Sequence, residues 1–87
     1  DLTIVYAIQN YDGIGNTYVG MTNSLKRRMS NHKSNGKLNT DKVYVLDVYR
    51  DRDRARLTEA DFHAQGYHGA YQRDNCELTK ELKQFVA

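Results

Sequence analysis

Two short strand-forming runs, separated by a turn-forming cluster, occupy the first twenty residues and constrain the fold most. Residues 3–9 (TIVYAIQ) and 17–20 (TYVG) are rich in β-branched and aromatic side chains, which favour strands. The cluster between them, residues 10–16 (NYDGIGN), has two glycines and the polar residues that are typical of turns. We therefore expect an antiparallel β-hairpin at the start of the chain, on which the other elements pack.

The rest of the chain predicts one more strand and three helices. A first helix, capped by Thr22, Asn23 or Ser24, runs to about Asn35, and Gly36 ends it. The most apolar run, residues 42–49, predicts the third strand, and the charged connection 50–54 leads to a second helix over 55–65, with Asp51 or Asp53 near its start. After a loop over 66–75, Asp74 and Glu77 have the spacing of a capping box and precede a last helix. One face of that helix carries Leu78, Leu82, Phe85 and Val86.

The expected fold is a single α/β domain of the α+β kind, spanning residues 1–87. The order β-β-α-β-α-α gives a small three-stranded sheet, mixed or antiparallel, flanked by helices. With 87 residues the chain has room for one core and no second specificity domain. Specificity beyond this domain would come from an additional specificity domain, from a homodimer or from substrate shape.

The first predicted helix has two distinct sides. At helical spacing its inward stripe consists of Leu25, Arg28, Met29 and His32. Arg27 points to the solvent side, whereas its neighbour Arg28 lies at the edge of the face that packs on the sheet. We therefore expect these adjacent arginines to have different roles.

Positive charge is concentrated in one stretch, although the net charge of the chain is only +2. No acidic residue occurs between Asp12 and Asp41, and a one-sign patch of this kind is typical of a surface that contacts phosphates. A solvated helix face explains the same composition. The candidate DNA-binding residues in this patch are Lys26, Arg27, Lys33 and Lys37.

The order of several residues resembles the GIY-YIG nuclease family over most of the chain. The two signature strands correspond to Ile4-Val5-Tyr6 and Tyr18-Val19-Gly20, with Ile4 in place of the first glycine of the signature. The family's helix arginine and the histidine one turn later correspond to Arg28 and His32. Its metal-binding glutamate corresponds to Glu59, and its downstream asparagine to Asn75.

The resemblance implies a metal-dependent DNA endonuclease with one divalent cation, Mg²⁺ or Mn²⁺, held by Glu59. Arg28 can place its planar guanidinium on the scissile phosphate. The resemblance implies that Tyr6 takes the proton from the attacking water. A free tyrosine is a poor base at neutral pH, so Tyr6 would need help from His32, a cation or a water relay. Tyr18 is expected to orient the reacting groups by hydrogen bonding rather than to transfer protons.

Simpler explanations exist for each of these residues. A strand tyrosine is usually a packing residue, a helix glutamate usually faces solvent, and Asn75 is equally well placed as a helix N-cap. Glu77 and Glu81 are the substitutes if Glu59 is not the metal ligand. His63, one turn after Glu59, could reach the same metal but is better explained as an exposed surface residue.

Two other functions remain open at this stage. The first is a non-catalytic or structure-specific nucleic-acid binding module of the same fold, acting on branched DNA or in repair. The second is an unrelated small protein-interaction domain. A binding module that had lost activity would be expected to lack at least one of the motif residues, all of which are present.

The single cysteine, Cys76, cannot form an internal disulfide and suits a reducing, intracellular setting, cytoplasmic or nuclear. The sequence has no basic-then-apolar leader. It also has no apolar run long enough to span a membrane, so we expect no membrane partner.

Overall fold

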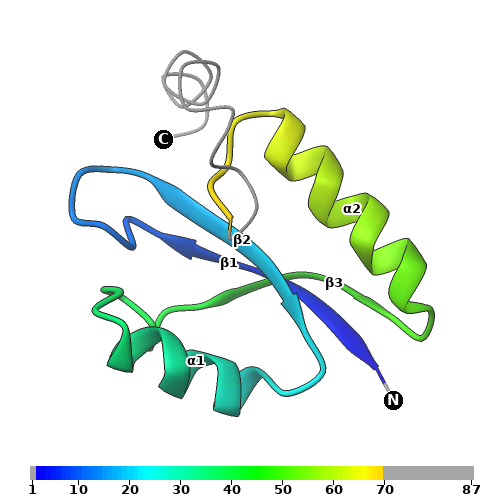
Figure 1. The fold of residues 1–87 in the computed structure, drawn as a ribbon, viewed down its shortest axis with the longest axis horizontal. Helices are drawn as coiled ribbons and strands as arrows, with labels where there is room; N and C mark the ends of the chain where they lie inside the picture. Colours follow the sequence, from blue (N-terminus) through cyan, green and yellow to red (C-terminus); the bar gives the residue numbers. More distant parts are fainter. Residues whose placement is uncertain (1, 70–87) are drawn as a thin grey trace.

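The computed structural model describes residues 2–69, which form three strands and two helices (Figure 1). In chain order these are β1 (Thr3–Gln9), β2 (Thr17–Thr22), α1 (Leu25–Ser34), β3 (Tyr44–Tyr49) and α2 (Arg52–Ala64). The predicted α+β class and the order β-β-α-β-α are confirmed. The predicted last helix lies outside the described residues, and so do Asn75, Cys76, Glu77 and Glu81.

The sheet has the strand order β2-β1-β3 and is antiparallel throughout, which settles the choice between a mixed and an antiparallel sheet. In the predicted hairpin, Tyr6 lies opposite Gly20 and Ile8 lies opposite Tyr18. The register of β1 against β3 shifts between Val5 and Tyr6. Because β1 is central, its residues are enclosed by a strand on each side.

Alternate residues of β1 pack on different helices, as the two-residue period of a strand requires. Val5 and Ala7 belong to one apolar cluster with Ala55 of α2, whereas Tyr6 and Ile8 belong to a separate cluster that includes Leu25 and Met29 of α1. The two helices therefore cover opposite faces of the sheet (Figure 1). Each face has a small apolar core of its own.

The burial of α1 follows the predicted stripe. His32 is buried, Arg28 and Met29 are half-buried, and Arg27 is exposed. Within the part of the chain that the structure describes, the outer side of this helix is exposed.

β2 ends at Thr22 rather than at Gly20, and two other element boundaries differ from the sequence prediction for a clear local reason. β3 begins at Tyr44 rather than at residue 42, because the amide of Lys42 closes a turn onto the carbonyl of Asn39. α2 begins at Arg52 rather than at residue 55, because the Asp51 carboxylate accepts a hydrogen bond from the amide of Asp53 and so caps the helix there. The first helical turn therefore lies within the segment that was predicted to be a charged connection.

The third strand is the most apolar in sequence but the least covered by the described residues. Tyr44, Val45, Leu46 and Val48 are each 38–53% exposed. β3 lies at one edge of the sheet, which accounts for part of this exposure. Neither of the two described helices has the length and apolar composition that crossing a membrane requires.

Candidate active site

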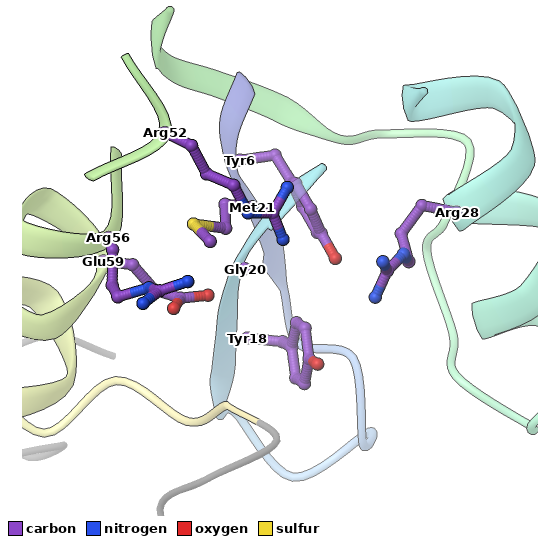
Figure 2. A pocket seen from close by; sticks show the side chains of 8 residues that line it. All are labelled: Tyr6, Tyr18, Gly20, Met21, Arg28, Arg52, Arg56 and Glu59. Atoms are coloured by element: carbon purple, nitrogen blue, oxygen red, sulfur yellow. The ribbon is translucent and has the colours of Figure 1, made fainter. Parts of the chain in front are cut away.

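A pocket of about 330 Å³ lies at the edge strand β2, where the two faces of the sheet meet (Figure 2). The strands contribute Tyr6, Tyr18, Gly20 and Met21 to its lining, α1 contributes Arg28, and α2 contributes Arg52, Arg56 and Glu59. Arg28 and the α2 side chains lie on opposite sides of β2 in this view. The pocket therefore joins side chains of two helices that are separated by the sheet.

The edge of β2 next to the pocket is covered by the segment that follows α2. The amide of Val19 donates to the carbonyl of His68, and the amide of His68 donates to the carbonyl of Thr17. Nε2 of His63 lies 2.9 Å from the carbonyl oxygen of Val19. These contacts occupy the first half of the β2 edge, and the pocket opens beside Gly20, in the second half.

Gly20 allows Tyr6 to reach this edge. A Cβ atom at position 20 would lie 2.6 Å from the Tyr6 hydroxyl oxygen and 2.8 Å from Cζ of the same ring. Real Cβ atoms do not approach other atoms so closely, so the Tyr6 ring lies across the backbone of Gly20 in space that a side chain would fill. The glycine of the second signature strand thus has a steric role in this structure.

Tyr6 and His32 form a buried pair. The Tyr6 hydroxyl and Nε2 of His32 are hydrogen-bonded at 2.7 Å, and the two side chains are 0% and 5% exposed. Burial, followed by the charges of Lys37 and Arg28, lowers the pKa of His32 from 6.5 to about 4. Burial and the neighbouring Tyr18 raise the pKa of Tyr6 above its ordinary value, despite the opposing charge of Arg28. At neutral pH the pair is therefore a phenol beside a neutral imidazole.

Tyr18 is held by rings on several sides. Its ring centroid lies 6.4 Å from that of Tyr6, 5.4 Å from that of Tyr11 and 4.9 Å from that of His32. The Nζ atom of Lys37 lies 5.0 Å from the ring centre, which is within cation–π range. The ring has little freedom to move, so Tyr18 can present a fixed surface to the pocket.

The predicted basic residues divide into two groups. Lys26, Arg27 and Lys33 are exposed on α1, as expected for residues that contact a phosphate backbone. Lys37 is half-buried over Tyr18 instead. Arg27 donates to the Asn23 side chain at 3.3 Å, whereas Arg28 lines the pocket.

Glu59 reaches the pocket from α2 and is half-buried. Burial raises the pKa of its carboxyl group, while His63, Arg52 and Arg56 oppose the rise. Residues 2–69 contain no group of three or more His, Cys, Asp or Glu side chains arranged to hold a metal. One carboxylate beside an open pocket nevertheless fits Mg²⁺, which keeps most of its waters and often takes its other ligands from substrate phosphates.

His63 differs from its sequence prediction. It was expected at the surface or, less favourably, at the metal, but the structure places it half-buried against β2. Its Nε2 atom contacts the backbone of Val19, and it is absent from the pocket lining. His63 therefore holds α2 and the segment after it on the edge strand.

Arg52 and Arg56 are pocket residues that the sequence analysis did not single out. They precede Glu59 by seven and three residues, so all three share one side of the helix. That spacing could have identified them, had α2 been predicted to begin at Arg52. Of the sequence-predicted candidates, Asn75 lies outside the described residues.

Comparison with known protein families gives one match. Residues 3–65 match the family described as the GIY-YIG catalytic domain, and these residues include every described side chain of the pocket. Searches of curated proteins and of solved structures found no significant match.

Proposed function

The chain belongs to the GIY-YIG catalytic-domain family, and on that premise we propose that it is a metal-dependent DNA endonuclease that cleaves phosphodiester bonds at the pocket on the β2 edge. The observation that supports this most directly is the convergence of Arg28, Tyr6 and Glu59 on one pocket. They come from α1, β1 and α2, and give the pocket a phosphate-binding cation, a hydroxyl group and a carboxylate.

In this proposal Arg28 binds the oxygens of the scissile phosphate. Its half-buried position limits the number of orientations that the guanidinium can take. A planar cation that donates two parallel hydrogen bonds matches the geometry of a phosphate and stabilises the charge that develops during attack. Arg27, exposed one residue earlier, has no access to this pocket.

Tyr6 and His32 move the proton of the attacking water. Tyr6 is a phenol at neutral pH, so it can accept that proton only as it gives its own to Nε2 of His32, 2.7 Å away. The water oxygen bonds to phosphorus, the bond from phosphorus to the leaving oxygen breaks, and the leaving oxygen takes a proton from solvent. His32 gains the proton that Tyr6 gives up. A bound phosphate also places negative charge near Arg28 and His32, which raises the pKa of the imidazole and favours this transfer.

Glu59 would hold the divalent cation, Mg²⁺ or Mn²⁺. When bound, such an ion supplies charge stabilisation at the phosphoryl oxygens. Partial burial makes the carboxyl group of Glu59 harder to ionise, whereas the arginines around it favour ionisation. Tyr18, fixed by its ring contacts, orients the substrate or its water by hydrogen bonding.

The test is cleavage of supercoiled plasmid with Mg²⁺ or with a chelator, using Arg28→Ala and the matched control Arg27→Ala. We expect Arg28→Ala to reduce the rate by at least about 10³-fold, because an arginine that stabilises phosphoryl transfer contributes on that order. Arg27→Ala should retain most of the activity. Equal losses in the two variants would reject the role of Arg28. Tight DNA binding by the wild type without cleavage in any divalent cation would favour a binding module.

A further inference from the structure

We propose that Arg52 and Arg56 form a second phosphate-binding subsite, which holds the phosphate next to the scissile one on the same DNA strand. This inference rests on the nuclease function proposed above. Both arginines line the pocket from the α2 side, opposite Arg28 (Figure 2). They give the site an anion-binding surface on the side of the sheet where the carboxylate lies.

The charge of the pocket supports this assignment. Its lining has the guanidinium groups of Arg28, Arg52 and Arg56 and a single carboxylate, Glu59, which leaves a formal excess of two positive charges. One phosphate at Arg28 does not balance that excess. A second phosphate does so in the metal-free pocket, and it also reduces the repulsion of the two α2 cations toward each other and toward a metal ion at Glu59.

The guanidinium groups are also available for a ligand. Within residues 2–69 neither makes a hydrogen bond to a protein group, and both side chains are exposed. A structural arginine is normally paired or packed, whereas these two project into a pocket. Their charges oppose the burial that raises the pKa of Glu59, but no hydrogen bond fixes them to it.

The helix geometry lets Arg52 and Arg56 contact the same phosphate, and the pocket size leaves room for it beside the scissile one. Arg52 and Arg56 are one turn apart on the same side of α2, about 6 Å along the helix axis. The pocket of about 330 Å³ has the volume of about ten water molecules, which exceeds the needs of one phosphate group. A strand that crosses the β2 edge would therefore meet Arg28 first and the two α2 arginines next.

The experiment replaces single phosphates with neutral methylphosphonates in a short duplex that the wild-type enzyme cleaves with Mg²⁺. Each phosphate on either side of the scissile one is neutralised in turn, and kcat/KM is measured for the wild type, Arg52→Ala and Arg56→Ala. Arg54→Ala is the matched control, since it removes the same charge from the same helix turn at an exposed residue outside the pocket. Circular dichroism checks that each variant is folded, and Arg52→Gln and Arg56→Gln replace any variant that is not.

We expect each alanine variant to lose about 10- to 100-fold in kcat/KM, the range of one charged hydrogen-bonded contact. Neutralising one neighbouring phosphate should cost the wild type a similar factor and cost the Arg56→Ala enzyme almost nothing more. Such non-additivity is the signature of a direct contact. Arg54→Ala should lose little activity and should remain as sensitive to that phosphate as the wild type.

Two outcomes would overturn the subsite while leaving the proposed function intact. If the loss in kcat/KM from an arginine variant and the loss from a neutralised phosphate simply add at every position, the arginines make no phosphate contact. Recovery of the variants at higher pH, again without dependence on phosphate position, would show that the arginines only keep Glu59 ionised. A wild-type enzyme that cleaves no DNA with any divalent cation would instead reject the proposed function, and the subsite with it.

Discussion

Replacing Gly20 with alanine tests whether the position of Tyr6 depends on the absence of a side chain at the β2 edge. The new Cβ would lie 2.6 Å from the Tyr6 hydroxyl oxygen, 2.8 Å from its Cζ and 3.2 Å from Cε1 of Tyr18. Ordinary contacts between such atoms begin near 3.5 Å, so the Tyr6 ring must shift by about 1 Å. Tyr6 is fully buried and hydrogen-bonded to His32, so that shift disturbs both the core and the pair.

The expected losses follow from this displacement. Overpacking of a well-packed core costs about 1–3 kcal/mol, and each kcal/mol lowers the Tm of a domain of this size by about 4–8 °C. We therefore expect Gly20→Ala to unfold on the order of 5–20 °C below the wild type. A misplacement of about 1 Å at a reacting group costs about 10²-fold in rate, so cleavage should fall by at least that factor.

Thermal unfolding by circular dichroism and plasmid cleavage well below both Tm values are the two assays. Gly36→Ala is the control, because φ is +86° there and a Cβ would meet nothing within 4 Å. That variant should lose about 1–3 kcal/mol from backbone strain alone and keep its cleavage rate. A Gly20→Ala protein with wild-type Tm and rate would refute the argument that Tyr6 occupies the space over Gly20.

Three further predictions concern the metal, the DNA and the histidine. Glu59→Gln should abolish Mn²⁺-dependent cleavage and weaken Mn²⁺ binding measured by calorimetry with DNA present; unchanged affinity and rate would assign the metal to another acid. Joint replacement of the exposed Lys26 and Lys33 with alanine should make the slope of log affinity against log salt shallower by about 2, because each phosphate contact contributes about 0.9. An unchanged slope would place the DNA on another surface. His32 should titrate near pH 4 by NMR. Because its folded pKa lies below its ordinary value of 6.5, the unfolded chain binds more protons between these values, so the wild type should lose stability as the pH falls from 6.5 to 4. His32→Gln should lose less over that range, and a difference of the opposite sign would contradict the assignment.

The sequence was most informative where a short-range period determines the structure. The alternation of β1 and the stripe of α1 follow from spacings of two and of three to four residues, so the inward position of Arg28 and the exposure of Arg27 could be predicted. The hairpin followed from its turn composition. These features depend on neighbours within a few residues.

Features that depend on a cap or on a distant segment were harder to predict. Asp51 starts α2 one turn earlier than its apolar residues suggest, and this brings Arg52 into the helix and the pocket. His63 contacts the carbonyl of Val19, 44 residues earlier, and no local pattern in a charged helix indicates that contact. For the same reason residues 50–54 were predicted to be a charged connection and Arg56 was not singled out, although Arg52 and Arg56 line the site.

Because the pocket lies across an edge strand, it forms only when the elements on both faces of the sheet are in place. The tyrosines, Arg28 and His32 are encoded within residues 6–32, whereas Glu59 is encoded 27 residues further on and arrives on the opposite face of the sheet. Arg28 and its neighbours therefore belong to the first half of the chain, and the carboxylate belongs to the second. In the proposed function, cleavage requires both halves on one completed sheet, so loss of either helix from the sheet should abolish activity even where the other half stays folded.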